Sequence, residues 1–228
     1  MGRHEAPRKA PEPPHLSRAS VGRLSLYLRR LEALLLDGQS RVSSAGLGEA
    51  LGVPDTQVRK DIAPLNCPGQ PGIGFAVADL IRAIRTRLGL DREWPAALVG
   101  VGNLARALLR YHGFPERGFR IVALFDADPS KVGKVVDGLE VLPSSRIAEG
   151  VARTGAELGI LTVPSAAAQP TADALIGAGV KGILNFAPGV IHTPSGVSVV
   201  NVDLTVQLEQ LAFLVQLSAQ GKESLPTR

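Results

Sequence analysis

Two glycines separated by one residue, Gly100 and Gly102, are the part of this sequence best suited to hold a ligand. They follow small apolar residues and precede a helical pattern. Gly100 would permit a sharp turn out of a strand, and Gly102 would let the backbone approach a pyrophosphate. A helix that starts near Asn103 would direct free N–H groups at the phosphates, and Ala105 stands where a third glycine often keeps helix and strand close. The segment therefore predicts a dinucleotide-binding turn.

An acidic residue at the end of the next predicted strand completes this pattern. Asp126 follows Gly102 by 24 residues. A carboxylate at that place accepts hydrogen bonds from both ribose hydroxyls and repels a 2′-phosphate, which favours NAD(H) over NADP(H). A related pocket for coenzyme A remains an alternative, because the small residues and the segment NFAPGV would also suit it.

The sequence offers no evident residues for a reaction at this site. Hydride transfer to a substrate needs a second pocket and usually a general acid or base. No histidine has a visible carboxylate partner in the sequence, and the histidines are His4, His15, His112 and His192. Cys67 is the single cysteine, and one thiol makes no zinc site. We expect no catalytic residue and no metal, with an NAD-dependent oxidoreductase carrying an accessory helix-turn-helix domain as the alternative.

The formal net charge of +4 is unevenly distributed. Residues 1–92 hold 14 Lys and Arg against 9 Asp and Glu, whereas residues 93–228 hold 11 against 12. This asymmetry indicates that the N-terminal part meets a polyanion. The sequence contains no run of eighteen apolar residues and no secretory signal, so we expect a cytoplasmic protein that does not bind a membrane.

The N-terminal part predicts a set of short helices. Residues 1–16 are rich in Pro and Arg and are expected to form a flexible basic arm. From Val21 to Leu36, apolar residues recur at spacings of three and four, which marks one face of a helix. Two shorter helices follow, the first capped by Ser43 or Ser44, and a Gly-Val-Pro segment joins them. With a wing rich in Gly and Pro, this pattern predicts a winged helix-turn-helix domain over residues 17–92.

The third predicted helix carries the residues that would face DNA. If Val58, Ile62 and Leu65 pack on the core, its polar side chains lie toward the flanks and the outer side. These polar residues are Gln57, Arg59, Lys60 and Asp61. Cations and amides can reach phosphates and base edges. We therefore predict DNA contacts for Ser44, Gln57, Arg59 and Lys60.

Residues 93–202 alternate short apolar runs with helical stretches, which is typical of a parallel sheet covered on both faces. The predicted strands are residues 96–101, 119–126, 157–163, 180–186 and 197–202, and helices start near Leu104, Ser144 and Ala167. Residues 203–221 predict a last helix that is apolar enough to need burial on more than one side. Such a helix needs a cover, and a second subunit is the expected one.

Over nearly its whole length, the chain resembles the family of redox-sensing transcriptional repressors called Rex. The segments that carry the resemblance are LYLRRLEAL, SSAGLGEALGV, QVRKD, GIGF, VGVGNLARALLRYHGF, FDADPSKVGK, ILNFAP and VNVDLTVQLEQLAFL. The resemblance implies an α/β protein with an N-terminal winged helix-turn-helix domain and a C-terminal Rossmann-like parallel sheet. It also implies a homodimer with a domain-swapped C-terminal helix, which binds palindromic double-stranded operator DNA and releases it when NADH binds. The sensed quantity would be the NADH/NAD⁺ ratio.

The resemblance further assigns roles to particular residues. Arg59 and Lys60 would contact DNA, Asp126 would bind the adenosine ribose, and Tyr111 would lie near the nicotinamide. The predicted cofactor site for NAD(H) comprises Gly100, Val101, Gly102, Asn103, Leu104, Ala105, Tyr111, Asp126, Asp128, Val163, Pro164, Asn185 and Phe186.

Three residues are implied as parts of a switch. Arg29 and Asp203 would form an ion pair in one state only. Leu204 stands where some relatives carry an aromatic residue beside the nicotinamide. The residues themselves also favour Asp203 as the N-cap of the last helix, and the two roles are compatible.

The wing departs from the family pattern between Asn66 and Phe75. Gln70 and Pro71 stand where Lys or Arg is usual, and Leu65-Asn66 replaces an aromatic-glycine step. Losing one or two phosphate contacts would weaken DNA binding and flatten its salt dependence, because each neutralised phosphate contributes roughly −0.9 to the log–log slope.

Overall fold

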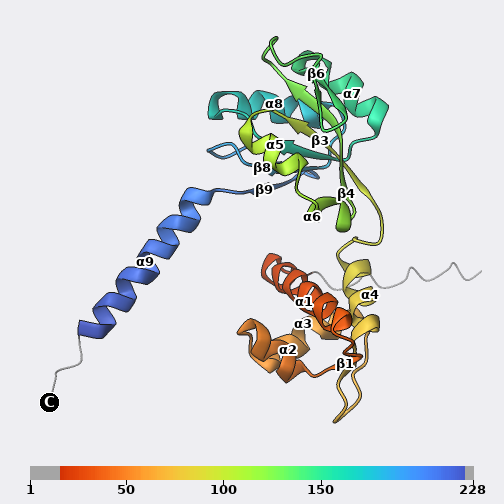
Figure 1. The fold of residues 1–228 in the computed structure, drawn as a ribbon, viewed down its shortest axis with the longest axis vertical. Coiled ribbons are helices and arrows are strands. Elements are labelled where there is room, and N and C mark those ends of the chain that lie inside the picture. The colour runs from red at the N-terminus through yellow and green to blue at the C-terminus, as the bar shows by residue number, and fades with distance from the viewer. Residues whose placement is uncertain (1–15, 224–228) are drawn as a thin grey trace, which may run out of the picture. The chain divides into compact units, whose positions relative to one another are not determined.

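The computed structural model describes residues 16–223, and the side chains of residues 16–218. The predicted basic arm, residues 1–16, lies outside the described residues except for Leu16. The chain divides into two compact units, Met1–Arg92 and Glu93–Arg228, shown in Figure 1.

The N-terminal unit contains the three predicted helices. They are α1 (Arg18–Leu36), α2 (Ser44–Leu51) and α3 (Asp55–Ile62). Ser17 caps α1 by accepting a hydrogen bond from Ser20 N–H at 3.1 Å. Of the two serines predicted to cap α2, Ser43 is the one that does so, accepting from Gly46 N–H at 2.9 Å. These hydroxyls satisfy N–H groups that have no partner within the helix.

The rest of this unit forms the wing and a closing helix. β1 (Arg41–Val42) pairs antiparallel with β2 (Phe75–Ala76), and a single bridge joins Gln70 to Gly74 in the segment before β2. The short helix η1 (Ala63–Leu65) follows α3, and α4 (Val77–Arg87) follows β2. All four α-helices contribute to one apolar core of Leu24, Tyr27, Leu28, Leu31, Leu47, Val58, Ile62, Val77, Leu80 and Ile84. The fold is the predicted winged helix-turn-helix.

The C-terminal unit is built on a seven-stranded sheet of order β5-β6-β4-β3-β7-β8-β9. Its strands are β3 (Trp94–Val99), β4 (Phe119–Asp126), β5 (Val135–Val136), β6 (Leu139–Pro143), β7 (Leu158–Leu161), β8 (Gly182–Asn185) and β9 (Ser198–Asn201). All neighbours run parallel except β5, which pairs antiparallel with β6. The parallel Rossmann-like sheet was predicted, whereas the hairpin of β5 and β6 was not.

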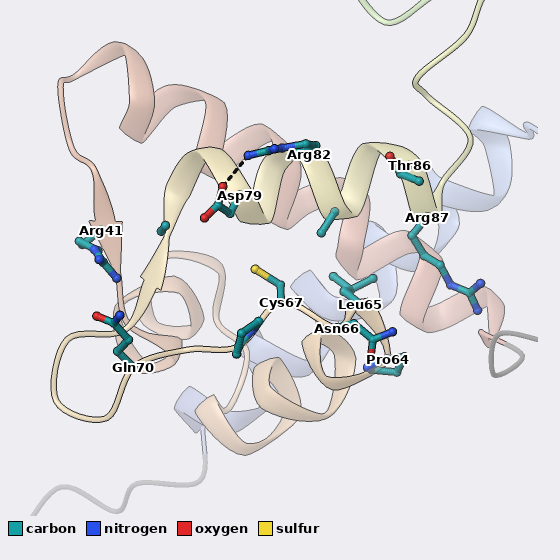
Figure 2. A pocket seen from close by; sticks show the side chains of 13 residues that line it. Arg41, Pro64, Leu65, Asn66, Cys67, Gln70, Asp79, Arg82, Thr86 and Arg87 are labelled. Carbon is teal, nitrogen blue, oxygen red and sulfur yellow. Dashed lines mark hydrogen bonds and ion pairs between the residues drawn. The ribbon is translucent and has the colours of Figure 1, made fainter.

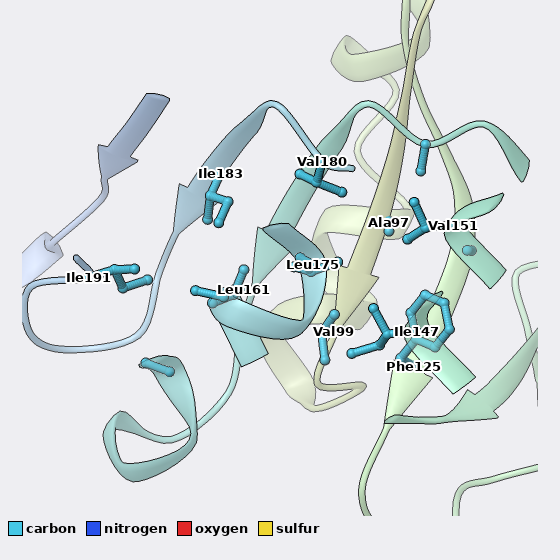
Figure 3. Packing of buried hydrophobic residues seen from close by; sticks show 14 of the residues in the cluster. Ala97, Val99, Phe125, Ile147, Val151, Leu161, Leu175, Val180, Ile183 and Ile191 are labelled. Atoms are coloured by element: carbon cyan, nitrogen blue, oxygen red, sulfur yellow. The ribbon is translucent and has the colours of Figure 1, made fainter. Parts of the chain in front are cut away.

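Helices pack against both faces of this sheet. The helices of the unit are α5 (Asn103–Leu109), α6 (Gly113–Glu116), η2 (Ser144–Arg146), α7 (Ile147–Thr154), α8 (Ser165–Gly177) and α9 (Leu204–Glu223). Figure 3 shows Ile147 of α7 and Leu175 of α8 packed against Phe125 and Leu161 of the sheet. On the opposite face, α5 packs through the fully buried Ala105.

The prediction that both faces are covered is wrong for the second half of the sheet. β8 and β9 are joined by residues 186–197, which contain no helix, so no described helix covers the α5 face of β8 and β9. On the same face, β7 is covered in part, because its Ile160 is buried in the cluster with Ala105 of α5. An apolar groove of about 420 Å³ lies there. Its lining includes Phe114, Phe119, Ile121, Leu158, Leu184 and Val200. The apolar side chains of α9 are also exposed in the single chain, and Leu208 is 65% exposed.

Candidate nucleotide site and DNA-facing helix

The turn at Gly100 is fixed by the fold itself. Gly100 has a φ of +94°, and a Cβ there would lie 2.7 Å from the carbonyl oxygen of Thr162. The Thr162 hydroxyl donates hydrogen bonds to the carbonyl oxygens of Gly100 at 2.6 Å and Val99 at 3.1 Å. Only glycine fits both the backbone angle and the space. Thr162 was not predicted from the sequence, because its partners lie 62 and 63 residues away.

The fold places no such demand on Gly102. Its φ is −95°, and a Cβ at this position would meet no atom within 4 Å. Gly102 is the N-cap of α5 and makes no side-chain cap, and the exposed Asn103 and Leu104 follow it. A pyrophosphate would approach the backbone through this open space, and any side chain at position 102 would partly fill it. The residues present therefore fit a dinucleotide.

Asp126 connects the end of β4 to this turn. Its Oδ2 accepts hydrogen bonds from Val101 N–H at 2.7 Å and from Lys131 Nζ at 3.0 Å, and its Oδ1 accepts from Asp128 N–H at 2.8 Å. Burial alone would raise the pKa of Asp126, but these donors together outweigh it and lower the pKa. The carboxylate is therefore ionised, and its three hydrogen bonds leave about one of its four acceptor positions for a ligand. Lys131 was missed, although it stands only five residues after Asp126.

Asp128 continues the same turn at the edge of the sheet. Its Oδ1 accepts a hydrogen bond from Ser130 N–H at 2.9 Å, and the hydrogen bonds from Ser130 lower the pKa of Asp128. Lys131 Nζ lies 3.9 Å from its Oδ2. Two carboxylates and one ammonium thus stand together at the place predicted for the ribose.

The other predicted cofactor residues come from the ends of β7 and β8. Val163 is half-buried beside Gly100, and Pro164 is the N-cap of α8. Asn185 is 1% exposed. Its amide nitrogen donates to the carbonyl of Ala187 at 3.1 Å, and its oxygen accepts from Ala187 N–H at 2.9 Å. The amide of Asn185 therefore shapes its own loop, and Phe186 is half-buried next to it. Contact of Asn185 with the cofactor stays a prediction.

The structure separates Tyr111 from the glycine turn of its own chain. Helix α5 starts at the carboxyl end of β3 and runs back, so Tyr111 follows at the other end of the sheet. There its ring packs on Phe114 with centroids 5.1 Å apart, and it lines a small cavity with Phe119, the first residue of β4. That Tyr111 lies near a nicotinamide stays a prediction.

Helix α3 of the N-terminal unit differs from its predicted arrangement at one residue. Val58 and Ile62 are buried as expected, but Asp61, expected on the polar side, is only 3% exposed. Asp61 accepts hydrogen bonds from Arg23 Nε at 2.6 Å and from Tyr27 Oη at 2.9 Å, both on α1. The prediction for Asp61 is wrong, because these partners lie 34 and 38 residues earlier in the chain.

The pKa shifts in this buried network keep Asp61 ionised and Tyr27 neutral. Burial alone would raise the pKa of Asp61, but the hydrogen bonds from Arg23, Tyr27 and Gln57 outweigh it and lower the pKa. Burial and the hydrogen bond to Asp61 raise the pKa of Tyr27 to about 12. The neutral phenol and the charged Arg23 therefore hold α3 against α1.

The cationic side chains of α3 lie on its exposed side. Arg59 Nη1 is 2.6 Å from Asp55 Oδ2 and 3.2 Å from Ser44 Oγ, which joins two residues predicted to contact DNA. Lys60 is exposed. Thr56 is also exposed in the first turn of α3, and sequence reasoning overlooked it even though the N-terminal residues of such a helix reach base edges.

The wing forms its two-stranded pairing even though its residues between Asn66 and Phe75 differ from the family pattern. Asn66 adopts a left-handed conformation with a φ of 51°, which explains how Asn replaces the usual glycine. A cavity of about 900 Å³ lies beside the wing. Figure 2 shows Arg41, Cys67 and Gln70 among the residues that line it. Burial raises the pKa of the Cys67 thiol, and the nearby Asp79 adds to the shift.

The predicted switch residues lie in different units. Arg29 is exposed on α1, and Leu204 is 66% exposed at the start of α9. Asp203 Oδ1 accepts a hydrogen bond from Thr205 N–H at 2.9 Å and therefore caps α9, as the residues indicated. The ion pair between Arg29 and Asp203 stays a prediction.

Two further features bear on the class of protein. Within residues 16–218, whose side chains the structure describes, no cluster of three or more His, Cys, Asp or Glu side chains could hold a metal ion. Among the described helices, none combines the length and the apolar character that a membrane crossing requires.

A winged helix-turn-helix unit joined to a Rossmann-like unit with a nucleotide-type turn defines a DNA-binding regulator that responds to a ligand. Residues 15–63 match the family model "Putative DNA-binding protein N-terminus", and residues 91–189 match the model "CoA binding domain". The chain belongs to the family of redox-sensing transcriptional repressors Rex. It is 47% identical to the Rex of Carboxydothermus hydrogenoformans, covering 87% of this chain and 95% of that protein, and 42% identical to the Rex of Streptomyces coelicolor, covering 98% and 86%.

Solved structures of a Rex-family repressor agree with this assignment. A complex of that repressor, RSP, with β-NAD⁺ and operator DNA matches with a TM-score of 0.86 at 34% identity, covering 92% of this chain and 97% of that chain. The complex of RSP with β-NADH matches with a TM-score of 0.83 at 33% identity, covering 92% and 99%. The relatives are thus named as regulators of transcription.

Proposed function

We propose that this chain is a transcriptional repressor that senses the NADH/NAD⁺ ratio. It binds palindromic operator DNA as a homodimer in the cytoplasm and releases it when NADH occupies the Rossmann-like unit. The chain does not consume the dinucleotide and is not an enzyme. The single observation that carries this proposal is the open space at Gly102, because a ligand accounts for a glycine that the fold does not need.

The residues that would hold NAD(H) surround this space. Gly100 and Gly102 shape the turn, the backbone at Asn103 and Leu104 faces the pyrophosphate, and Asp126 recognises the adenosine ribose. Val163, Pro164 and Phe186 line the same edge of the sheet, at the ends of β7 and β8. When bound, NAD(H) supplies a nicotinamide whose charge differs between its oxidised and reduced forms, and this difference is what a sensor must detect.

The dimer follows from two apolar surfaces that the single chain leaves exposed. Eight large apolar side chains are exposed among the described part of α9, and the groove over β7, β8 and β9 has no cover among the described residues. In the proposed homodimer, α9 of the partner subunit is exchanged and covers such a surface. Glu substitutions at Leu208 and Leu211 should give a monomer in size-exclusion chromatography with light scattering. The matched variant Val135→Glu, on an exposed apolar residue outside the groove, should remain dimeric, and a dimeric Leu208/Leu211 variant would contradict the proposal.

The DNA-binding surface is the exposed side of α3. Arg59 and Lys60 supply cations for phosphates, and Gln57 supplies an amide. Ser44, at the start of α2, adds a hydroxyl next to Arg59. Two such helices must stand about 34 to 36 Å apart to enter successive major grooves. The switch, with Arg29 and Asp203 paired in one state, would change this separation.

Gel-shift binding to a library of palindromic duplexes tests the function. The dimer should retain a specific duplex with NAD⁺ and release it with NADH, because NADH favours the form that does not match the operator. Coenzyme A serves as the comparison, since one family model carries its name. Retention of the duplex at saturating NADH, or release by coenzyme A alone, would overturn the proposal.

A further inference from the structure

The amide of Gln57 is held in one orientation by a buried carboxylate. Gln57 Nε2 donates to Asp61 Oδ1 at 3.0 Å, one helical turn further along α3. Asp61 is ionised, because its three hydrogen-bonding partners lower its pKa. An ionised carboxylate only accepts hydrogen bonds, so the nitrogen of the Gln57 amide must face it.

Asp61 has no capacity left for any other partner. Arg23 donates twice, from Nε to Oδ2 at 2.6 Å and from Nη2 to Oδ1 at 2.8 Å. Tyr27 Oη donates to Oδ2 at 2.9 Å, and Gln57 supplies the fourth hydrogen bond. A carboxylate offers about four acceptor positions. Asp61 therefore contacts no DNA and acts only on the side chains around it.

The fixed amide leaves a specific pair of groups free. Its oxygen is repelled by the Asp61 carboxylate, so the N–H that lies trans to this oxygen is the one that donates to Asp61. The oxygen and the remaining N–H then form the opposite edge of the amide, with an acceptor beside a donor. Adenine presents the complementary pattern in the major groove, a donor at N6 and an acceptor at N7.

Resting on the proposed DNA-binding function, we propose that Gln57 reads an A·T base pair in each operator half-site and that Asp61 is its positioning residue. Gln57 lies on the flank of α3 within its first turn, where recognition helices contact base edges. The hydrogen bonds from Arg23 and Tyr27 hold Asp61 in place, and Asp61 in turn orients the amide of Gln57 that would contact the base pair.

Binding to a duplex library randomised in both half-sites tests this inference on the full-length dimer. For the wild-type chain, replacing A·T by G·C at one position of each half-site should weaken binding by about tenfold or more. In Gln57→Ala, the preference at that position should vanish while the preferences elsewhere remain. The matched variant Gln39→Ala, at an exposed glutamine just after α1, should keep every preference.

Two variants separate positioning from stability. Asp61→Asn retains Gln57 but allows its amide to turn over, so the preference for A·T at that position should fall. Tyr27→Phe removes a hydrogen bond of the same carboxylate and lowers the melting temperature, yet it should keep the preference, because Asp61 still orients Gln57. If Asp61→Asn does not fold, Gln57→Ala still decides whether Gln57 reads the base pair.

The outcomes also separate this inference from the proposed function. Sequence-specific, NADH-sensitive binding whose base preferences are unchanged in Gln57→Ala would overturn the reading role and leave the repressor function intact. A full A·T preference in a folded Asp61→Asn would overturn the positioning role. A wild-type chain that selects no sequence and ignores NADH would refute the proposed function itself.

Discussion

The backbone N–H of Val101 donates a hydrogen bond to Asp126 Oδ2 at 2.7 Å. The carboxylate assigned to ribose recognition therefore also holds the glycine turn in place. Since Lys131 donates to the same oxygen, the acid, the turn and the ammonium form one hydrogen-bonded group. These hydrogen bonds fix the position of the carboxylate relative to the glycine turn.

Asp126→Asn should weaken NADH binding by roughly ten- to hundredfold, because hydrogen bonds to a charged group contribute about 1.5 to 3 kcal/mol. It should also reduce the discrimination against NADPH, because the negative charge that repels a 2′-phosphate is lost. Calorimetric titration with both nucleotides measures this. Glu149→Gln, which removes an exposed carboxylate paired with Arg146, should bind as the wild type does. An unchanged preference for NADH in Asp126→Asn would contradict the role of this acid.

The two glycines of the turn should respond differently to the same substitution. Gly100→Ala should destabilise the C-terminal unit by about 1 to 3 kcal/mol, because of its left-handed φ and the close Thr162 carbonyl. Gly102→Ala should leave the melting temperature nearly unchanged and abolish NADH binding, since its methyl group would occupy the space for the pyrophosphate. Thermal melting and NADH titration on both variants check this. Full NADH affinity in Gly102→Ala would refute the location of the site.

The buried network of Asp61 predicts an acid-sensitive N-terminal unit. The pKa of Asp61 is lower in the folded chain than its ordinary value of 3.8. Its contribution is therefore complete above pH 3.8 and is lost as the pH falls through the lower, folded value. Asp61→Asn should cost roughly 3 to 5 kcal/mol at neutral pH and make stability less dependent on acid.

Circular dichroism melts across this pH range measure the effect. Asp79→Asn is the matched control, since Asp79 forms an exposed pair with Arg82. It should keep the wild-type pH profile. An Asp61→Asn profile as steep as that of the wild type would show that Asp61 is not the group responsible.

The altered wing predicts a modest salt dependence of DNA binding. Gln70→Lys restores a cation and should raise operator affinity, steepening the log–log salt slope by about 0.9 per subunit. Equilibrium binding at several salt concentrations gives the slope. Val135→Lys adds the same charge in the other unit and should leave the slope unchanged. Equal slopes for Gln70→Lys and the wild type would mean that the wing does not reach DNA.

Local signals in the sequence predicted much of the fold. Alternating apolar segments identified the parallel strands, and hydroxyl or carboxylate side chains at Ser43 and Asp203 marked helix starts. The hairpin of β5 and β6, which was not predicted, also had a local signal, the Asp137-Gly138 pair. In the structure, both residues have positive φ and form the turn of this hairpin. That signal was overlooked.

Other features depended on partners distant in the sequence. The inward position of Asp61 requires Arg23 and Tyr27. The spacing of Asp61 from Val58 places it on the buried side of α3, but its charge led to the prediction that it is exposed. Tyr111 lies at the far end of α5 from the glycine turn, because α5 runs back along the sheet. The glycine motif alone does not indicate this. The uncovered face of the sheet resulted from a loop in place of a helix between β8 and β9.

The most direct test of the central claim is the affinity of NADH for the dimer with and without saturating operator. Coupling between two binding sites is reciprocal, so the operator must weaken NADH binding by the same factor by which NADH weakens operator binding. We predict a lower NADH affinity in the DNA complex. An identical NADH affinity in both conditions would show that the nucleotide does not control DNA binding.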